Sequence, residues 1–310
     1  AITNGGDLGK WLLKRPGDNY RFVLEIPDED SNQNEDVNYS LSFDGIDDHI
    51  IIDNTADIVG TDDFSIAFWF RTDNLISSDT YKMLVNSDTG NQQWTFAIEY
   101  GGLEGRATGV LSFIVFTGGV NSSVNYELTS DERIDDGNWH FAVGTRERNS
   151  GEIKLYIDGN LYASSISGTQ EFASTTNMRL GNNIINSRYF DGNINELSVW
   201  NRLLSQSEVQ DLMFNSLNGN ENNLTGYWNF NDGEGSTLTD LSINGNDGTI
   251  YGATWIDNGA PLQAPEPVPG VINVPEQFSS IQDAVDYAIH GDTILVQPGT
   301  YYENVYINKS

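Results

Sequence analysis

The stretch Glu152-Ile-Lys-Leu-Tyr-Ile-Asp-Gly159 is a run of apolar and β-branched residues that ends in an Asp-Gly pair. Short runs of this composition are typical of β-strands. A second such run follows the pair, and Asp-Gly between two runs predicts a two-residue hairpin turn, because this turn needs positive φ angles at both positions. The stretch therefore predicts an antiparallel hairpin.

Similar runs recur from residue 39 to residue 258 and are separated by Asp, Asn and Gly. This pattern is typical of antiparallel strands joined by tight turns. Many such strands in one segment predict an all-β sandwich. The clearest runs are Phe64-Ser-Ile-Ala-Phe-Trp-Phe70, Trp94-Thr-Phe-Ala-Ile-Glu-Tyr100 and Val110-Leu-Ser-Phe-Ile-Val-Phe116.

One short helix is predicted within this segment. Ser205-Gln-Ser-Glu208 has the pattern of a capping box, in which the Ser and Glu side chains satisfy free backbone donors of the first turn. Val209, Leu212 and Met213 follow at helical spacing. We expect this helix to cover one end of the sandwich.

The charge of the chain limits its partners. The 310 residues include 15 Lys and Arg against 45 Asp and Glu, which gives a formal net charge of −30. A negative field of this size repels phosphate backbones, so we expect no nucleic-acid partner. No run of about 18 apolar residues occurs, so we expect no membrane insertion. Divalent cations and neutral glycans are compatible with this charge, whereas the absence of Cys excludes thiolate chemistry.

Composition divides the chain into an N-terminal segment with an acidic linker, the sandwich, a Pro-rich linker and a last segment of different character. The acidic, amide-rich stretch covers residues 28–36 and follows one possible strand over 20–26. Four of the eight prolines fall within residues 261–269, which predicts an extended spacer. The four segments span residues 1–38, 39–258, 259–270 and 271–310.

The last segment predicts one helix followed by two short strands. Ser280-Ile-Gln-Asp283 begins an amphipathic helix that has Ala284 and Val285 on its apolar face. The strands are predicted over residues 293–297 and 304–308. Because so few residues cannot bury both faces of these strands, we expect them to be the beginning of a larger structure.

The sandwich segment contains five separated motifs, which are Leu41-Ser-Phe-Asp-Gly-Ile-Asp-Asp48, Asp136-Gly-Asn-Trp-His-Phe-Ala142, Lys154-Leu-Tyr-Ile-Asp-Gly159, Tyr189-Phe-Asp-Gly-Asn-Ile-Asn-Glu-Leu197 and Trp200-Asn-Arg-Leu-Leu-Ser205. In order and spacing they resemble the laminin G-like, concanavalin A-type jelly roll of secreted bacterial proteins. The resemblance covers about residues 39–258 and implies a secreted or cell-surface location. The chain departs from the family at Phe141, where a second His is usual, and at Asn195, where Asp is common.

The stretch Leu224-Thr-Gly-Tyr-Trp-Asn-Phe-Asn-Asp-Gly-Glu-Gly235, together with residues 240–250, resembles the piece that precedes the Phe-Asp-Gly strand in this family. Here it follows that strand. Either the first strands of the jelly roll are supplied from the C-terminal side, or a second copy has been cut short. We favour the first interpretation, because the termini of compact domains often lie close together.

Ile281-Gln-Asp-Ala-Val285 and residues 291–305 resemble the beginning of a right-handed parallel β-helix of the pectin lyase-like superfamily. The resemblance implies that the predicted helix caps the open end of this solenoid. The expected fold class is therefore all-β, with an antiparallel jelly-roll sandwich and a short capping helix, followed by the truncated start of a parallel β-helix.

Several acidic residues suggest a calcium site. A hard cation such as Ca²⁺ takes about six to eight oxygen ligands, many of them carboxylates. Related jelly rolls often hold a structural calcium near the first Phe-Asp-Gly turn, so the resemblance implies a site formed by Asp44, Asp47, Asp191 and Glu196, in which Asp48 is an alternative to Asp47. The competing interpretation is that Asp-Gly and Asp-Asp are ordinary turn residues that stabilise their own backbone.

No motif in the chain predicts catalysis. The Glu, Asp and Glu pattern that glucanases of this fold place on one strand is absent from the sequence, and we interpret His140 as a half-buried structural residue. Aromatic side chains that could form a glycan-binding platform are Tyr81, Trp94, Tyr100 and Tyr189.

The first functional hypothesis is a non-catalytic extracellular binding or adhesion module that is stabilised by calcium and binds a glycan or a cell-surface protein. The second is an accessory region of a polysaccharide lyase or hydrolase whose catalytic β-helix lies beyond residue 310. The third is a structural spacer in a surface filament.

Overall fold

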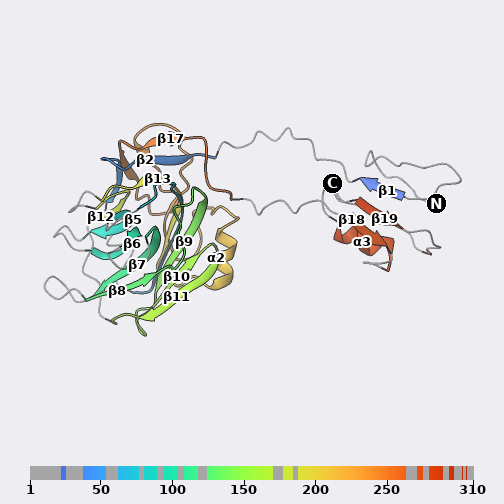
Figure 1. Cartoon of the computed structure of the whole chain (residues 1–310), viewed down its shortest axis with the longest axis horizontal. Coiled ribbons are helices and arrows are strands. Elements are labelled where there is room, and N and C mark those ends of the chain that lie inside the picture. Colours follow the sequence, from blue (N-terminus) through green and yellow to red (C-terminus); the bar gives the residue numbers. More distant parts are fainter. Residues whose placement is uncertain are drawn as a thin grey trace. The chain divides into compact units, whose positions relative to one another are not determined.

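A computed structural model gives the structure of the protein (Figure 1). It describes residues 22–25, 38–53, 62–76, 80–88, 94–102, 108–117, 124–169, 177–183, 188–262, 271–274, 279–288, 293–296, 302 and 305. The chain divides into two compact units. One is Val37–Ala264, and the other combines Ala1–Asp36 with Pro265–Ser310.

The larger unit is an all-β sandwich of two antiparallel sheets. We name the first the β13 sheet, after the strand that pairs with three others, and the second the β6 sheet. The order of strands in the β13 sheet is β11 (Asn160–Ile166), β10 (Glu152–Ile157), β9 (Trp139–Arg146), β4 (Phe64–Arg71), β13 (Asp191–Trp200), β2 (Ser40–Asp44) and β17 (Thr254–Ile256), and β14 (Leu224–Trp228) also pairs with β13. The order in the β6 sheet is β15 (Thr237–Leu238), β16 (Gly248–Tyr251), β3 (His49–Asp53), β12 (Asn177–Leu180), β5 (Thr80–Asp88), β6 (Trp94–Gly102), β7 (Val110–Thr117) and β8 (Val124–Thr129).

The main core lies between the two sheets. Along β4, Phe64, Ile66, Phe68 and Phe70 point into it at every second position, as the period of a strand requires. The β6 sheet contributes residues such as Phe96 and Phe113 from its inner face. Burial of these apolar side chains is the main stabilising force of the sandwich.

The predicted helix is confirmed as α2 (Gln206–Leu212). Both capping-box bonds are present, because the Ser205 hydroxyl accepts from the Glu208 backbone N–H and the Glu208 carboxylate accepts from the Ser205 N–H at 2.8 Å. Val209 is fully buried in a second apolar cluster on the outer face of the β13 sheet, with Trp200 and Tyr227. Figure 1 shows α2 beside β9, β10 and β11, so the helix covers part of that face. The expectation that it covers one end of the sandwich was therefore wrong.

The predicted hairpin is also confirmed. β10 and β11 are antiparallel neighbours, and Ile157 pairs with Asn160 across a two-residue turn. Asp158 and Gly159 have φ angles of +48° and +74°, as the primed turn requires.

The C-terminal strands belong to both sheets of the sandwich. β14 pairs with β13, β16 pairs with β3, and β17 pairs with β2. Trp228 of β14 is fully buried in the main core, and its indole N–H donates to the Asn246 carbonyl oxygen at 3.1 Å. These pairings agree with the interpretation that the C-terminal side supplies strands to the sandwich. Residues 224–256 are part of the two sheets and do not form a second, truncated jelly roll.

In the part of the smaller unit that the structure describes, there are a three-stranded sheet and a helix. β1 (Phe22–Glu25) is antiparallel to β19 (Thr293–Val296), and β18 (Val271–Val274) is parallel to it on the other edge. Helix α3 (Ile281–Tyr287) begins at Ser280, as predicted, and buries Ala284 and Val285.

The structure shows only part of what the sequence predicts for the smaller unit. The described residues form a mixed sheet and show no parallel β-helix, and the predicted strand over residues 304–308 lies outside them apart from Val305. The prediction also assigned residues 1–38 and residues 271–310 to different segments. In the structure, strand β1 of the first segment pairs with strand β19 of the last. Pairing between strands so far apart leaves no local signal in a sequence.

Within the described part of the chain, the helices are too short to cross a membrane.

We predict that Trp228→Ala destabilises the whole sandwich by about 3–5 kcal/mol, because it removes a large buried side chain and leaves a cavity between the sheets. Chemical denaturation of the chain, followed by tryptophan fluorescence and circular dichroism, measures this loss. Ile243→Ala serves as the control, since Ile243 is 84% exposed in the same C-terminal region. A Trp228→Ala protein as stable as the parent would mean that β14 is not part of the core.

Candidate functional site

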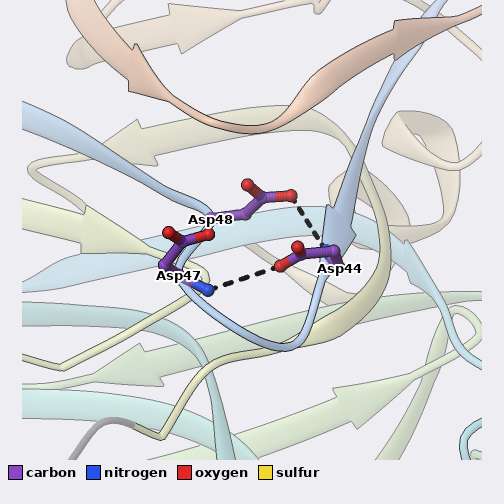
Figure 2. A group of neighbouring side chains, drawn as sticks. All are labelled: Asp44, Asp47 and Asp48. Carbon is purple, nitrogen blue, oxygen red and sulfur yellow. Dashed lines mark hydrogen bonds between the residues drawn. The ribbon is translucent and has the colours of Figure 1, made fainter.

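Three aspartates meet in the turn between β2 and β3. Figure 2 shows Asp44, Asp47 and Asp48, whose carboxylates each offer an oxygen within 4.8 Å of the others. Asp44 Oδ1 accepts from the backbone N–H groups of Ile46 at 2.8 Å and Asp47 at 3.4 Å, and Asp48 Oδ2 accepts from the Asp44 N–H at 2.9 Å. The turn is therefore fixed by its own carboxylates, and the remaining carboxylate oxygens are the possible ligands of a cation.

The electrostatics of this turn favour a cation. Asp48 is buried, and this burial raises the pKa of its carboxyl. The hydrogen bond from the Asp44 backbone N–H lowers this pKa, whereas the negative charges of Asp44 and Asp47 raise it further. Three carboxylates so close together repel one another, and a divalent ion would relieve this repulsion. Clustered carboxylate oxygens are the ligands that Ca²⁺ prefers.

Asp191, the third predicted ligand, lies beside this turn. It pairs with Asp44 across the β2 and β13 strands, and its side chain faces Gly45 so closely that a Cβ on Gly45 would be 2.9 Å from the Asp191 Cβ. Gly45 also has a φ of +75°, which favours glycine. The turn therefore requires glycine both for this backbone angle and for the space next to Asp191. The Asp191 carboxylate accepts from the Asn74 amide at 2.8 Å. It therefore adds a carboxylate on the β13 side of the turn without belonging to the group of three.

Glu196, the fourth predicted ligand, lies elsewhere. It is five residues further along β13, which corresponds to about 15 Å of strand, and it falls in an irregularity with a φ of +53°. Its Oε2 accepts from the Tyr227 hydroxyl at 2.8 Å, and its side chain is 8% exposed. Burial raises the pKa of Glu196 to about 7, against the lowering effect of the Tyr227 hydroxyl. The structure therefore brings Glu196 to Tyr227 and brings Asp48 to the other two aspartates.

His140 joins two turns. Its Nδ1 lies 2.9 Å from Asp158 Oδ2, and its Nε2 lies 3.2 Å from Asp136 Oδ1. Burial lowers the pKa of this imidazole, but the two carboxylates outweigh it, and the net shift is upward. The Asp158 carboxylate also accepts from the Phe141 N–H at 2.8 Å. This arrangement holds a hairpin turn against the start of β9 and agrees with a structural role.

The four aromatic residues named from the sequence lie in different surroundings. Tyr100 is fully buried in the core, so it cannot form an exposed platform. Tyr81 and Tyr189 are half-buried, whereas the side chain of Trp94 lies outside the described residues. Of these, Tyr81 has a charged neighbour, because the Arg188 guanidinium lies over its ring at 5.1 Å.

Asn195, where the family commonly has Asp, has a structural role. Its amide nitrogen donates to the Tyr39 carbonyl oxygen at 2.6 Å, and its Oδ1 accepts from the Ala260 N–H at 3.1 Å. Asn195 is fully buried, and a carboxylate there could not donate to Tyr39. The amide thus holds both ends of the sandwich segment against β13.

Two antiparallel sheets that pack over an apolar core define the class as an antiparallel β-sandwich. Residues 44–210 match the family profile Laminin_G_3 of the concanavalin A-like lectin/glucanases superfamily. This match covers more than half of the chain, and the protein belongs to that family. No functionally curated protein gives a significant match.

Several solved structures align with the chain at low sequence identity. A proposed carbohydrate-binding protein from Bacteroides ovatus aligns with a TM-score of 0.57 and 17% identity over 81% of this chain and 72% of its own. A heptameric SAP-like pentraxin from Limulus polyphemus aligns with a TM-score of 0.48 and 15% identity over 62% of this chain and 89% of its own. The CBM40 of an IT-sialidase from Ruminococcus gnavus, bound to α2,3-sialyllactose, aligns with a TM-score of 0.43 and 16% identity over 55% of this chain and 94% of its own.

We predict that Glu196→Gln stabilises the protein at high pH only. The carboxyl has a reference pKa of 4.5 and a pKa of about 7 in the fold, so the folded chain holds the proton more tightly. The stability of the parent protein therefore falls as the pH rises from about 4.5 to about 7, and then stays level. Glutamine still accepts from the Tyr227 hydroxyl but cannot ionise. The gain above pH 7 should be roughly 1–3 kcal/mol and should vanish near pH 4.5.

Urea unfolding of both proteins at pH 4.5, 6, 7 and 8.5 measures this difference. Glu234→Gln is the matched control, because Glu234 is exposed in the same unit. A Glu196→Gln effect that is the same at every pH would show that the carboxyl of Glu196 is not buried as described.

Proposed function

We propose that this protein is a non-catalytic, glycan-binding module of a larger secreted or cell-surface protein, and that calcium stabilises its sandwich. The observation that carries the calcium part is the convergence of three carboxylates in the turn between β2 and β3. Membership of the concanavalin A-like family supports the glycan part.

Two further observations favour a glycan over other partners. The structurally similar protein from Bacteroides ovatus is itself a proposed carbohydrate-binding protein. The net charge of −30 disfavours nucleic acids and anionic membrane surfaces but does not oppose an uncharged polysaccharide. A cell-surface protein is the other partner compatible with this charge.

In this proposal Asp44, Asp47 and Asp48 hold the ion, and Asp191 adds a carboxylate from β13. Glu196 takes no part, because it lies about 15 Å along β13 and bonds to Tyr227. A calcium ion here would cross-link the end of β2, the start of β3 and the start of β13. Its role would be structural, since the turn that holds it joins strands of both sheets.

A second function has one observation in its favour. β18 and β19 are parallel, which is the pairing of a β-helix, and α3 packs on the same small core. This pairing supports the interpretation that the chain is an accessory region of a polysaccharide lyase or hydrolase whose catalytic part is a parallel β-helix. The antiparallel strand β1 on the free edge of β19 argues against it, because a further coil would have to pair elsewhere.

We predict that calcium raises the thermal midpoint of the protein and that Asp47→Asn abolishes this rise. A ligand that binds only the folded state stabilises it by mass action, by about 2.7 kcal/mol when its concentration is about 100 times the dissociation constant. Asp47 is the residue of choice, because its exposed carboxylate holds no backbone group of the turn in place. Calorimetry with calcium and with a chelator measures the shift.

Asp53→Asn is the control variant, since Asp53 is an exposed aspartate at the end of β3. It should keep the full calcium response. A parent protein whose midpoint does not change with calcium would rule out the metal site and leave the spacer interpretation in its place.

A further inference from the structure

Tyr251 is an exposed aromatic residue on the outer face of the β6 sheet, at the end formed by β15, β16 and β3. Its side chain is 47% exposed. Tyr251 pairs with His49 across β16 and β3, and the two rings are stacked, with centroids 4.8 Å apart and planes 9° apart. Because the imidazole lies against one side of the Tyr251 ring, the exposed area belongs to the other side and to the rim of the ring.

The stacked pair is held in place from the acidic turn. His49 Nδ1 lies 2.8 Å from the Asp47 carbonyl oxygen, and a carbonyl only accepts, so Nδ1 carries the hydrogen of this bond. Gly252 follows Tyr251 and has a φ of +82°, and a Cβ at Gly252 would overlap Asp48 Oδ1. The position of the Tyr251 ring is therefore set before a ligand arrives, and little ordering is needed when one binds.

Hydroxyl groups lie beside this ring on the same face. Thr249 and Tyr251 alternate along β16 with Ile250 of the core, so both point away from the core. Thr249 pairs with Thr237 of β15 on one side and with Ile51 of β3 on the other. Both threonines are exposed, Ile51 is half-buried, and no described residue forms a hydrogen bond with either threonine hydroxyl. Two accessible hydroxyls and an aliphatic surface thus lie next to the aromatic ring.

We infer that this surface, which we call the Tyr251 face and which consists of His49, Ile51, Thr237, Thr249 and Tyr251, binds a neutral polysaccharide with one sugar ring stacked on Tyr251. This inference rests on the proposed function and adds the site and the class of ligand. The C–H groups on one face of a pyranose ring form an apolar surface that suits an aromatic ring. The hydroxyl groups of the sugar both donate and accept hydrogen bonds, and so do those of threonine.

The charges around the Tyr251 face select against acidic glycans. The three carboxylates of the turn at residues 44–48 lie beside the stacked pair, and Asp53 is exposed at the end of β3. Arg179, the partner of Ile51 on β12, is half-buried and balances one of these charges. Even with a divalent ion in the turn, the field of a chain with net charge −30 repels uronate and sulfate groups. A neutral polysaccharide meets no such repulsion.

Binding of the full chain to immobilised polysaccharides, measured by biolayer interferometry with calcium in the buffer, tests the inference. Galactomannan, xyloglucan and mixed-linkage β-glucan form the neutral arm, and hyaluronan and chondroitin sulfate form the acidic arm. The parent protein should bind at least one of the neutral polysaccharides and neither of the acidic ones.

Three variants test the Tyr251 face. Tyr251→Ala should weaken binding roughly tenfold because the stack is lost, whereas Tyr251→Phe keeps the ring and should bind within about twofold of the parent. Thr249→Val keeps the shape of the side chain but removes its hydroxyl, and should weaken binding roughly threefold. Tyr302→Ala is the matched control, because Tyr302 is a 96% exposed tyrosine in the smaller unit, and it should bind like the parent. The thermal midpoint of each variant is measured to show that it is folded.

The imidazole NMR signals of the parent protein give a second readout that does not depend on the stability of a variant. The chain has three histidines, and His140 lies on β9 of the opposite sheet, between Asp136 and Asp158. An oligosaccharide of the polysaccharide that binds should shift the signals of His49, which are identified by their loss in His49→Asn. The signals of His140 should stay unchanged.

Each failure has its own meaning. A folded Tyr251→Ala protein that binds like the parent, with unshifted His49 signals, would overturn the site but leave the proposed function standing. Binding to hyaluronan or chondroitin sulfate would overturn the ligand class. A parent protein that binds none of the polysaccharides would overturn the proposed function and this inference with it.

Discussion

The pairing of β13 with three other strands is the constraint on which the rest of the sandwich depends. Its first half pairs with β2 and its second half with β14 along one edge, while β4 pairs along the other. β2 begins at residue 40 and β14 begins at residue 224, so one strand joins distant parts of the chain. The same register sets Asp191 opposite Asp44 and so places the β13 carboxylate beside the acidic turn.

Negative charge is managed differently in different parts of this molecule. Glu99 has Arg188, Glu196 has the Tyr227 hydroxyl, and the Asp240 carboxylate accepts from the backbone N–H groups of Tyr227, Ser242 and Asn246. In the turn at residues 44–48, three carboxylates lie within 4.8 Å of one another, and the neighbouring His49 lowers the pKa of Asp48. A bound cation is the simplest way to balance the three carboxylates that meet there.

Local patterns were sufficient to predict the fold class, the Asp-Gly hairpin and the capping box of α2, because each depends on neighbouring residues. The Asp44 and Asp47 part of the acidic turn was predictable for the same reason. The hydrogen bond between Glu196 and the Tyr227 hydroxyl was not, since it joins residues 31 positions apart through the pairing of β13 with β14. The β1–β19 pairing was also missed, because it arises from a contact between residues far apart in the chain.

The most direct test of the central claim, that the turn between β2 and β3 binds calcium, is a crystal structure determined from calcium-containing solution. The account predicts electron density for one ion about 2.3–2.6 Å from carboxylate oxygens of Asp44, Asp47 and Asp48. Well-ordered carboxylates with only water between them, at the same calcium concentration, would contradict it.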